Sequence, residues 1–347
     1  MADHSPITLK KIAEKAGLAV STVSYALRNS PQVSRATCLK VQSLARELGY
    51  RPNTRVAGLM SHIRQAHSRQ AIETIAFIWV DCDRLRSQQT HFFQLLIFGA
   101  RKRADQIGYK LQEFWLEDPG MSPRRIRDIL LAQGITGIIF SAATMHDSIN
   151  LGIDLSPFAS AVIGSTSWTP ECHRTAHDHY GGLMECLSQL SQTGIERPAA
   201  IIDPSVNERC RRSYEAAFNT FAPQPTPSRY LRLTRWRDGE EMVGWLRSLK
   251  TDGLIINSYR YLGEELVKRL QSEMGLPIVS LYLRPNDPDM WGIDQCYDQI
   301  AANAVDLVAG QLNNNEYGTP TFPHVLHFSG RWAHSGNLTG DVEALEE

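Results

Sequence analysis

The stretch TLKKIAEKAGLAVSTVSYALRNSPQVSRATCLKVQSLARELGYRPN, residues 8–53, decides the architecture of the first part of this 347-residue chain. Thr8 is a good N-cap for a first helix that Gly17 ends, and a very short turn leads into a second helix. Ser34 caps a third helix, whose apolar residues recur along one face. Two helices joined by a tight turn and packed under a third describe a helix-turn-helix unit. The three helices are expected over 9–16, 21–27 and 36–48.

The second of these helices carries side chains that suit nucleic acid. Its exposed positions are expected to hold short or planar hydrogen-bonding groups, which fit base edges and phosphates in a major groove. These residues are Ser21, Thr22, Ser24, Tyr25 and Arg28.

Charge is unevenly distributed along the chain. The whole sequence has 36 basic and 37 acidic side chains, a net charge of −1. Residues 1–60 hold nine of the basic side chains and three of the acidic ones, so this segment carries +6 and the remainder −7. A small basic head on a larger acidic body indicates that the head binds a polyanion. A solvated helical surface is the alternative that a charge count leaves open.

The head resembles the DNA-binding headpiece of the LacI/GalR (lactose and galactose repressor) family. Roughly twenty positions agree in order and spacing, which is far more specific than a lone motif. The resemblance implies a sequence-specific transcriptional regulator, expected to be a repressor, that binds double-stranded operator DNA. The matching elements are Thr8-Leu9, Ile12-Ala13, Ala16-Gly17, Thr22-Val23-Ser24, Val33-Ser34, Val41, Leu48-Gly49-Tyr50 and Pro52-Asn53.

The resemblance also assigns roles to single residues. The base-reading positions of the family fall on Val20, Ser21 and Tyr25. The family often has Arg where this chain has Tyr25, and the change to Tyr removes the usual bidentate reader of guanine. The family also usually has Ser where this chain has Ala19. An unusual operator sequence is therefore expected. The other residues that the resemblance places on DNA are Thr8, Thr22, Ser24, Arg28, Asn29, Ser34 and Tyr50.

Residues 53–70 are expected to form a hinge helix and linker. In the family, two such helices from a dimer wedge leucines into a central minor-groove step and kink the duplex. Leu59 occupies the wedge position here, and Asn53 and Val56 complete the expected contact set. A plain linker is the alternative. The predicted division is a headpiece over 1–52, this hinge over 53–70 and a two-lobed domain for effector binding and dimerisation over 71–347.

The body alternates strands and helices, which demands parallel sheets with helices on both faces. Two successive sets of repeats predict an α/β fold of two doubly wound lobes, with a ligand cleft at the carboxyl ends of the strands. The first set is expected as strand 72–80, helix 92–107, strand 109–115, helix 122–133, strand 135–140 and strand 161–164. The second is expected as helix 181–192, strand 199–202, helix 206–221, strand 230–233, helix 239–249, strand 253–257, helix 263–274 and strand 277–281.

The body resembles the effector module of the same family, which is similar to periplasmic sugar-binding proteins, although loosely after about residue 210. The resemblance implies a homodimer and a small-molecule effector, expected to be a carbohydrate, bound between the lobes. His91, Phe92 and Phe93 fall where ligand-facing residues sit, and aromatic faces suit the C–H side of a sugar. The other cleft candidates are Ser141, Asp178, Asn257 and Arg211, with Arg209 and Arg212 as rivals of Arg211. The alternative is that the phenylalanines are core and the arginines surface residues.

Other function classes are disfavoured. The first strand is not followed by GxGxxG and no strand by GxSxG, so neither a dinucleotide enzyme nor a Ser-His-Asp enzyme is expected. The cluster of Cys172, His173, His177 and His179 lacks regular ligand spacing, so neither a metal nor another cofactor is expected. The alternative to a regulator is a catalytic or ligand-sequestering sugar-binding α/β protein whose DNA contact is incidental.

The cellular setting follows from what the sequence does not contain. The six cysteines are too scattered for a disulfide framework, which predicts free thiols. No apolar run approaches the ~18 residues that span a bilayer. The first residues, MADHSPITLKKIAEKAG, lack the apolar stretch of a secretion signal. We therefore expect a cytoplasmic protein that does not contact membranes.

Overall fold

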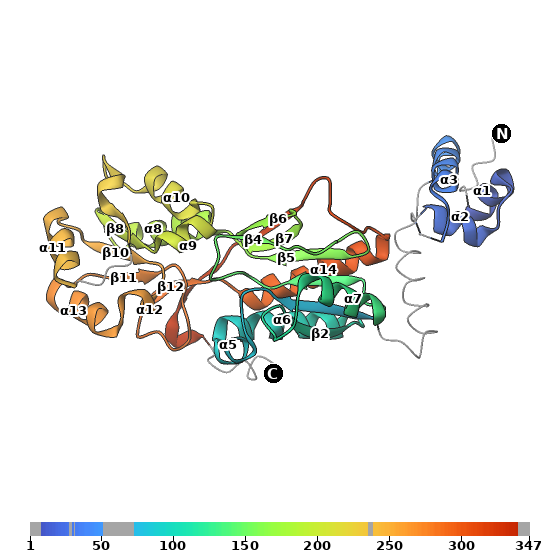
Figure 1. The fold of residues 1–347 in the computed structure, drawn as a ribbon. Coiled ribbons are helices and arrows are strands. Elements are labelled where there is room, and N and C mark those ends of the chain that lie inside the picture. Colours follow the sequence, from blue (N-terminus) through green and yellow to red (C-terminus); the bar gives the residue numbers. More distant parts are fainter. Residues whose placement is uncertain (1–7, 28–29, 31, 51–72, 235–238, 339–347) are drawn as a thin grey trace, which may run out of the picture.

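The computed structural model describes residues 8–27, 30, 32–50, 73–234 and 239–338 (Figure 1). Its first part confirms the predicted three-helix head. The Thr8 side chain accepts a hydrogen bond from the backbone N–H of Lys11, and Gly17 adopts the left-handed conformation that ends the first helix. Buried Val23 and Val41 lie in one small core that all three helices share. The helices are α1 (Leu9–Ala16), α2 (Val20–Leu27) and α3 (Arg35–Glu47).

The first lobe of the body is a six-stranded parallel sheet in the order β13-β7-β5-β3-β1-β2. Ile75, Phe77 and Trp79 face a core that α6 and α14 cover, whereas Ala76 and Ile78 face a second core under α7. This alternation is why the first strand reads as continuously apolar. The strands are β1 (Thr74–Trp79), β2 (Lys110–Trp115), β3 (Gly137–Phe140), β5 (Ala159–Ile163), β7 (His173–His177) and β13 (Val325–Phe328).

Four helices and a small second sheet complete this lobe. The α6 and α14 helices lie along one face of the sheet and α7 along the other. The helices are α5 (Arg84–Gln89), α6 (His91–Gln106), α7 (Pro123–Ala132) and α14 (Tyr297–Asn314), and the small sheet pairs β4 (Ser148–Asn150) with β6 (Ser167–Thr169).

The second lobe has a six-stranded sheet in the order β14-β12-β11-β10-β8-β9, parallel except for β14. Two cores again lie on its two faces, one under α8 and α10 and the other under α11 and α13. The strands are β8 (Pro198–Ile202), β9 (Leu231–Leu233), β10 (Gly253–Ile256), β11 (Ile278–Ser280), β12 (Trp291–Asp294) and β14 (Arg331–His334). The helices are α8 (His179–Gln192), α9 (Pro204–Arg209), α10 (Ser213–Phe221), α11 (Gly239–Leu249), α12 (Tyr259–Leu262) and α13 (Glu264–Met274).

The chain passes between the lobes three times. It leaves the first lobe after β7 to form α8, returns from β12 into α14, and leaves again from β13 into β14. The expectation of two doubly wound α/β lobes is confirmed. Within the described ranges, no helix combines the length and apolar character needed to cross a membrane.

One expected helix is wrong. The sequence pattern predicted a continuous helix over 206–221, but the structure has α9 and α10 with a break at Cys210–Arg212. Arg211 and Arg212 adopt φ values of 54° and 57°, in the left-handed region that a helix cannot contain. No Gly or Pro marks the break, so the apolar periodicity continues through it. The sequence pattern also predicted no element at β7, β12, β13, β14 or α14, which lie at the three crossings.

A close helix packing in the first lobe depends on Gly99. A Cβ atom there would overlap the backbone carbonyl of Asp298 at the start of α14, so α6 and α14 can approach this closely only with glycine. Gly99→Ala should therefore force the helices apart and reduce the free energy of unfolding by about 2 kcal/mol, as overpacking does. Chemical denaturation measures this. Gly310→Ala on α14, where a Cβ would meet open space, is the control and should be neutral or stabilise by about 0.5–1 kcal/mol. Equal effects of the two changes would contradict the packing argument.

Candidate nucleic-acid interface and interlobe site

The exposed face of α2 presents the three expected base-reading residues. Val20 and Tyr25 are 45% and 38% exposed, and Ser21 is exposed beside them. Val23 and Ala26, on the opposite face, are fully buried against α1 and α3, which fixes the orientation of α2. The sequence therefore places a rigid helix on the surface of the head with its short polar and aromatic side chains facing solvent.

The other residues expected to contact DNA differ in their burial and in their local hydrogen bonds. The side chains of Thr8 and Ser34 accept hydrogen bonds from backbone N–H groups of α1 and α3, so both serve as helix caps. Tyr50 packs against the core of the head. Thr22 and Ser24 are half-buried on α2. The predicted contacts Arg28, Asn29, Asn53, Val56 and Leu59, like the hinge over 53–70, lie outside the described residues.

Among the expected cleft residues, Phe92 contacts the opposite lobe. Its ring packs edge-on against Tyr297 of α14, with centroids 4.4 Å apart, and lies 6.4 Å from the ring of Tyr282, which follows β11 of the second lobe. His91 is half-buried next to it, and burial, followed by the charge of Arg284, lowers its pKa. Phe93 lies in the core of the first lobe, 1% exposed, and offers almost no surface to a ligand.

Three further candidates hold the ends of strands. Ser141 is fully buried, and its hydroxyl accepts a hydrogen bond from the N–H of Val80. The Asn257 amide oxygen accepts a hydrogen bond from the N–H of Asp203, which joins the ends of β10 and β8. The Asp178 carboxylate caps α8 through the N–H of Gly181, at 2.9 Å. Each therefore shapes the carboxyl edge of its lobe through a local contact.

Of the three rival arginines, two reach the other lobe. Arg211 donates from Nε to the carbonyl oxygen of Ser165 at 3.1 Å and from Nη2 to Glu171 at 3.0 Å. Arg209 lies 3.7 Å from Asp147 of the first lobe. Arg212, by contrast, pairs at 2.7 Å with Glu215 of its own lobe. The structure thus separates three neighbours that the sequence could not rank.

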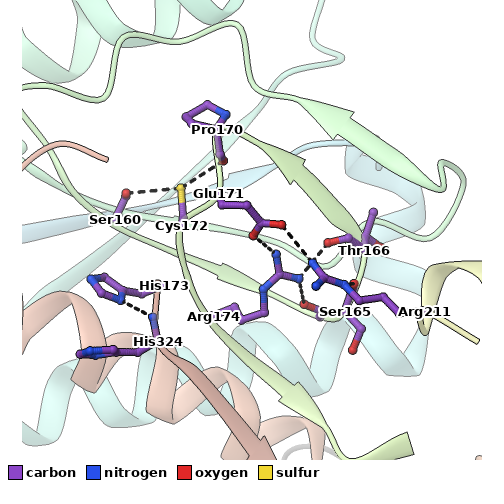
Figure 2. A network of polar contacts seen from close by, with 11 residues as sticks. Ser160, Ser165, Thr166, Pro170, Glu171, Cys172, His173, Arg174, Arg211 and His324 are labelled. Atoms are coloured by element: carbon purple, nitrogen blue, oxygen red, sulfur yellow. Dashed lines mark hydrogen bonds and ion pairs between the residues drawn. The ribbon is translucent and has the colours of Figure 1, made fainter. Parts of the chain in front are cut away.

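Figure 2 shows that Glu171 lies between two guanidinium groups. One carboxylate oxygen binds Arg211, and the other binds Arg174 of β7, which is 2% exposed. The Nη1 atom of Arg174 also donates to the carbonyl oxygens of Thr166 and Gly164, at 2.9 and 3.2 Å. A buried cation is held only where a counter-charge and hydrogen-bond acceptors surround it, and this arrangement supplies both.

A second polar network lies at the crossings. His177 and Phe328 join two crossings through a 3.0 Å bond between Nδ1 and the carbonyl oxygen. The His179 ring bonds to the Tyr214 hydroxyl at 2.8 Å, and the Gln295 amide donates to the same hydroxyl at 3.3 Å. Tyr297, whose ring contacts Phe92, donates its hydroxyl to the Gln295 side chain. Hydrogen bonds thus connect the crossings to the aromatic rings between the lobes.

Sequence reasoning did not find Glu171, Tyr282, Gln295 or Tyr297. Their only local signal is a polar or aromatic side chain in the segment that leaves a strand. The predicted spacing of strands did not extend to β12 and α14, so nothing indicated that Tyr297 would lie against Phe92.

The four residues weighed as metal ligands do not converge on one point. The Cys172 thiol lies buried 3.8 Å from the Ser160 hydroxyl, whereas the His173 ring accepts a hydrogen bond from the N–H of His324. His177 and His179 lie farther along, at the crossing. Among the described residues, no group of three or more His, Cys, Asp or Glu side chains is placed to hold a metal ion.

Two surface recesses lie on the first lobe. One of about 390 Å³ runs along α7 and is lined by Arg124, Arg125 and Ile129 among others. The other, of about 290 Å³, lies where Val80 and Leu116 follow β1 and β2 and includes His146. Neither recess is lined by an expected effector-binding residue.

Comparison with known proteins agrees with this architecture, a helix-turn-helix head on a two-lobed α/β body. Residues 8–53 match the family described as "Bacterial regulatory proteins, lacI family". The chain is 27% identical to the HTH-type transcriptional regulator MalR of Streptococcus pneumoniae, over 56% of this chain and 57% of that protein. It is 26% identical to the HTH-type transcriptional repressor CytR of Escherichia coli, over 58% and 55%. The matches thus span little more than half the length of these relatives.

Solved structures show the same fold at low identity. The transcriptional regulator CelR–cellobiose complex superposes with a TM-score of 0.51 and 17% identity, covering 95% of this chain and 100% of that one. The lac repressor dimer bound to operator and the anti-inducer ONPF gives 0.51 and 16%, covering 96% and 100%. The head thus matches the lacI family of bacterial regulatory proteins, and the chain shares the fold of these solved structures.

The buried histidine at the crossing predicts a pH dependence of stability. Burial lowers the pKa of His177 to about 4, against the opposing effects of Asp178, Asp294 and the Phe328 carbonyl, and His327 lowers it further. The ordinary value is about 6.5, so below that pH the unfolded chain binds a proton that the folded chain does not. The contribution of neutral His177 to stability is thus present above pH 6.5 and is lost as the pH falls toward 4.

This loss is measurable by urea denaturation at several pH values. The free energy of unfolding should fall by up to about 1.4 kcal/mol per pH unit across the window for this group alone. His177→Gln should reduce the slope of the profile between pH 6.5 and 4, the remaining slope coming from other histidines such as His179, whose pKa burial also lowers. Parallel profiles for the variant and the unaltered chain would show that His177 is not responsible.

Proposed function

We propose that this protein is a transcriptional regulator, acting as a repressor, that binds operator DNA through the exposed face of α2. The observation that carries the proposal is the placement of Val20, Ser21 and Tyr25 on the outer face of a helix whose other face is locked in the core of the head. Short polar and aromatic groups on such a helix reach base edges in the major groove. The match of residues 8–53 to the lacI family supports the same role.

The expected DNA complex is a homodimer on a pseudo-palindromic site. Two heads would occupy successive major grooves, and the hinge residues Asn53, Val56 and Leu59 would contact the minor groove between them. Two-fold symmetry in the operator would mirror that of the protein. The lac repressor, a structural relative solved as a dimer bound to operator, supports this assembly. We expect the protein to act in the cytoplasm, where it has access to DNA.

The body is proposed to bind a carbohydrate effector between its lobes. Phe92 of the first lobe faces Tyr282 of the second, and aromatic faces suit the apolar side of a sugar ring. Two relatives support the ligand class, since CelR was solved with cellobiose and the lac repressor with ONPF. An effector that binds one arrangement of the lobes more tightly than another would shift the population of DNA-binding dimers.

The DNA proposal is tested with the full chain. An operator is first selected from random duplexes, and affinity is then measured by fluorescence anisotropy at several salt concentrations. Tyr25→Ala should weaken operator binding by about tenfold, the effect of losing one good base contact, and should change non-specific binding less. Ser43→Ala, an exposed change on α3, is the control and should bind as the unaltered chain does. Failure to select any preferred sequence would overturn the proposal.

The effector proposal has a separate test. Isothermal titration against a panel of mono- and disaccharides should identify a ligand, and Phe92→Ala should weaken its binding by about tenfold because one stacking face is lost. Phe221→Ala, a change of a 44% exposed side chain on α10, should leave the affinity unchanged. If no carbohydrate binds, the ligand class is wrong, while the DNA proposal stands on its own result.

A further inference from the structure

We propose that Glu171 forms a latch between the lobes, by which its carboxylate, shared between Arg174 and Arg211, favours the arrangement of lobes seen here. Its regulatory meaning rests on the proposed function, because only a protein whose lobes move in response to an effector needs a releasable contact of this kind.

The first-lobe half of the latch is fixed. Arg174 is 2% exposed, and two carbonyl oxygens, those of Thr166 and Gly164, hold its guanidinium group. Its remaining positive charge requires a carboxylate, because an uncompensated charge in the interior is strongly unfavourable. Glu171 supplies it with one oxygen. The Glu171 side chain therefore stays attached to the first lobe and remains 44% exposed, with its other oxygen available to the second lobe (Figure 2).

The second-lobe half is presented by the break between α9 and α10. Arg211 adopts a left-handed conformation that a non-glycine residue enters at a cost of about 1 kcal/mol. The turn is closed by hydrogen bonds from the N–H groups of Arg211 and Arg212 to the carbonyl oxygens of Glu208 and Asn207, at 2.8 and 2.7 Å. A glycine would fit this turn with less strain, so the side chain at this position points to a use for it. That use is the contact with Ser165 and Glu171.

The strength of the contact suits a latch that must open. The side chains of Arg211 and Glu171 are 50% and 44% exposed, and ion pairs exposed to this degree contribute little net free energy. Water can therefore replace the contact when the lobes rotate. Arg209 and Asp147, 3.7 Å apart, form a second and looser pair from the same turn. The interlobe contact of this turn is thus polar and releasable, whereas the cores of both lobes are apolar.

The test measures the distance between the lobes in the full chain, without DNA or effector. Donor and acceptor dyes are attached at Ala132→Cys on α7 and Gln271→Cys on α13, both exposed, in a Cys296→Ser background because the other five cysteines are buried. Single-molecule energy transfer then gives the population of separated lobes. Arg211→Gln should raise the ratio of separated to latched molecules by about threefold to fivefold, as expected for an exposed ion pair.

The matched control is Arg212→Gln. Arg212 is the next residue, adopts the same backbone conformation and loses an ion pair of similar length, but that pair is with Glu215 of its own lobe. The ratio of separated to latched molecules should therefore not change. If Arg211→Gln and Arg212→Gln behave alike, Arg211 does not latch the lobes.

Glu171→Gln completes a double-mutant cycle. In combination with Arg211→Gln it should separate the lobes no further than Arg211→Gln alone, because that change already removes the contact with Glu171. Additive effects would overturn the shared-carboxylate arrangement. Glu171→Gln also leaves Arg174 without its counter-charge, so its melting temperature is measured in parallel; Arg211→Gln keeps the Arg174–Glu171 pair and tests the latch should the other variant fail to fold.

The outcome is separable from that of the proposed function. The distance measurement needs no operator, so a protein that selects no DNA sequence can still show the latch. Conversely, if the protein binds operator normally and Arg211→Gln leaves the distance between the lobes unchanged, there is no latch. If the protein is an operator-binding regulator and also has the latch, Arg211→Gln should change operator affinity by a factor similar to the change in the ratio of separated to latched molecules.

Discussion

The body is constrained above all by the three passages of the chain between its lobes. Three covalent connections side by side hold the lobes together at the crossings. The available large motion is a rotation about these connections, which moves the outer parts of the lobes apart. Hydrogen bonds join these connections to one another. The Phe328 carbonyl accepts from the N–H of Asp178 at 2.8 Å and bonds to His177, and a Cβ at Gly330 would meet the backbone of Asp294 and the His177 ring. The crossings therefore form a compact pivot. Contacts between the lobes that lie farther from this pivot have the larger effect on the rotation of the lobes.

The chemistry of the contacts differs within and between the lobes. Each sheet is covered on both faces by apolar cores, which hold the lobes as rigid bodies. The contacts described between lobes are aromatic edges and ion pairs from arginines, which tolerate rearrangement better than a packed core does. Phe92 and Tyr282 meet on one side, while Arg211 meets Glu171 elsewhere along the boundary. A ligand that altered either of these contacts would change the relative stability of the arrangements that the two lobes can adopt.

The sequence predicted the head well because its signals are local. Thr8, Gly17 and Ser34 cap helices through contacts within four residues, and the structure confirms all three. The repeating strands and helices of the body were also predicted, because burial on both faces leaves a continuous apolar pattern. The break at Arg211 was not, since its left-handed turn uses residues that carry no turn signal. Phe92 and Phe93 are adjacent, and only the packing of α6 shows that one faces the other lobe and the other the core.

The least predictable features are pairs distant in the sequence. Glu171 and Arg211 are 40 residues apart and come from different lobes. Each alone is a charged residue of the kind that usually lies solvated on a surface. Their meeting depends on how the lobes close about the pivot, which is a property of the whole body. The same holds for Tyr297 and Gln295, whose roles follow from the return of the chain into α14.

The edge strands β13 and β14 are consecutive in the sequence, and they complete the sheets of different lobes. The first lobe also lacks one wall of its core until α14 arrives. On the ribosome, therefore, the head can fold as soon as it emerges, whereas neither lobe has its full set of strands until the last part of the body has been made. The order of synthesis thus places the part proposed to read DNA before the part proposed to control it, and the segment from β13 to β14 is the last of the three crossings to be made.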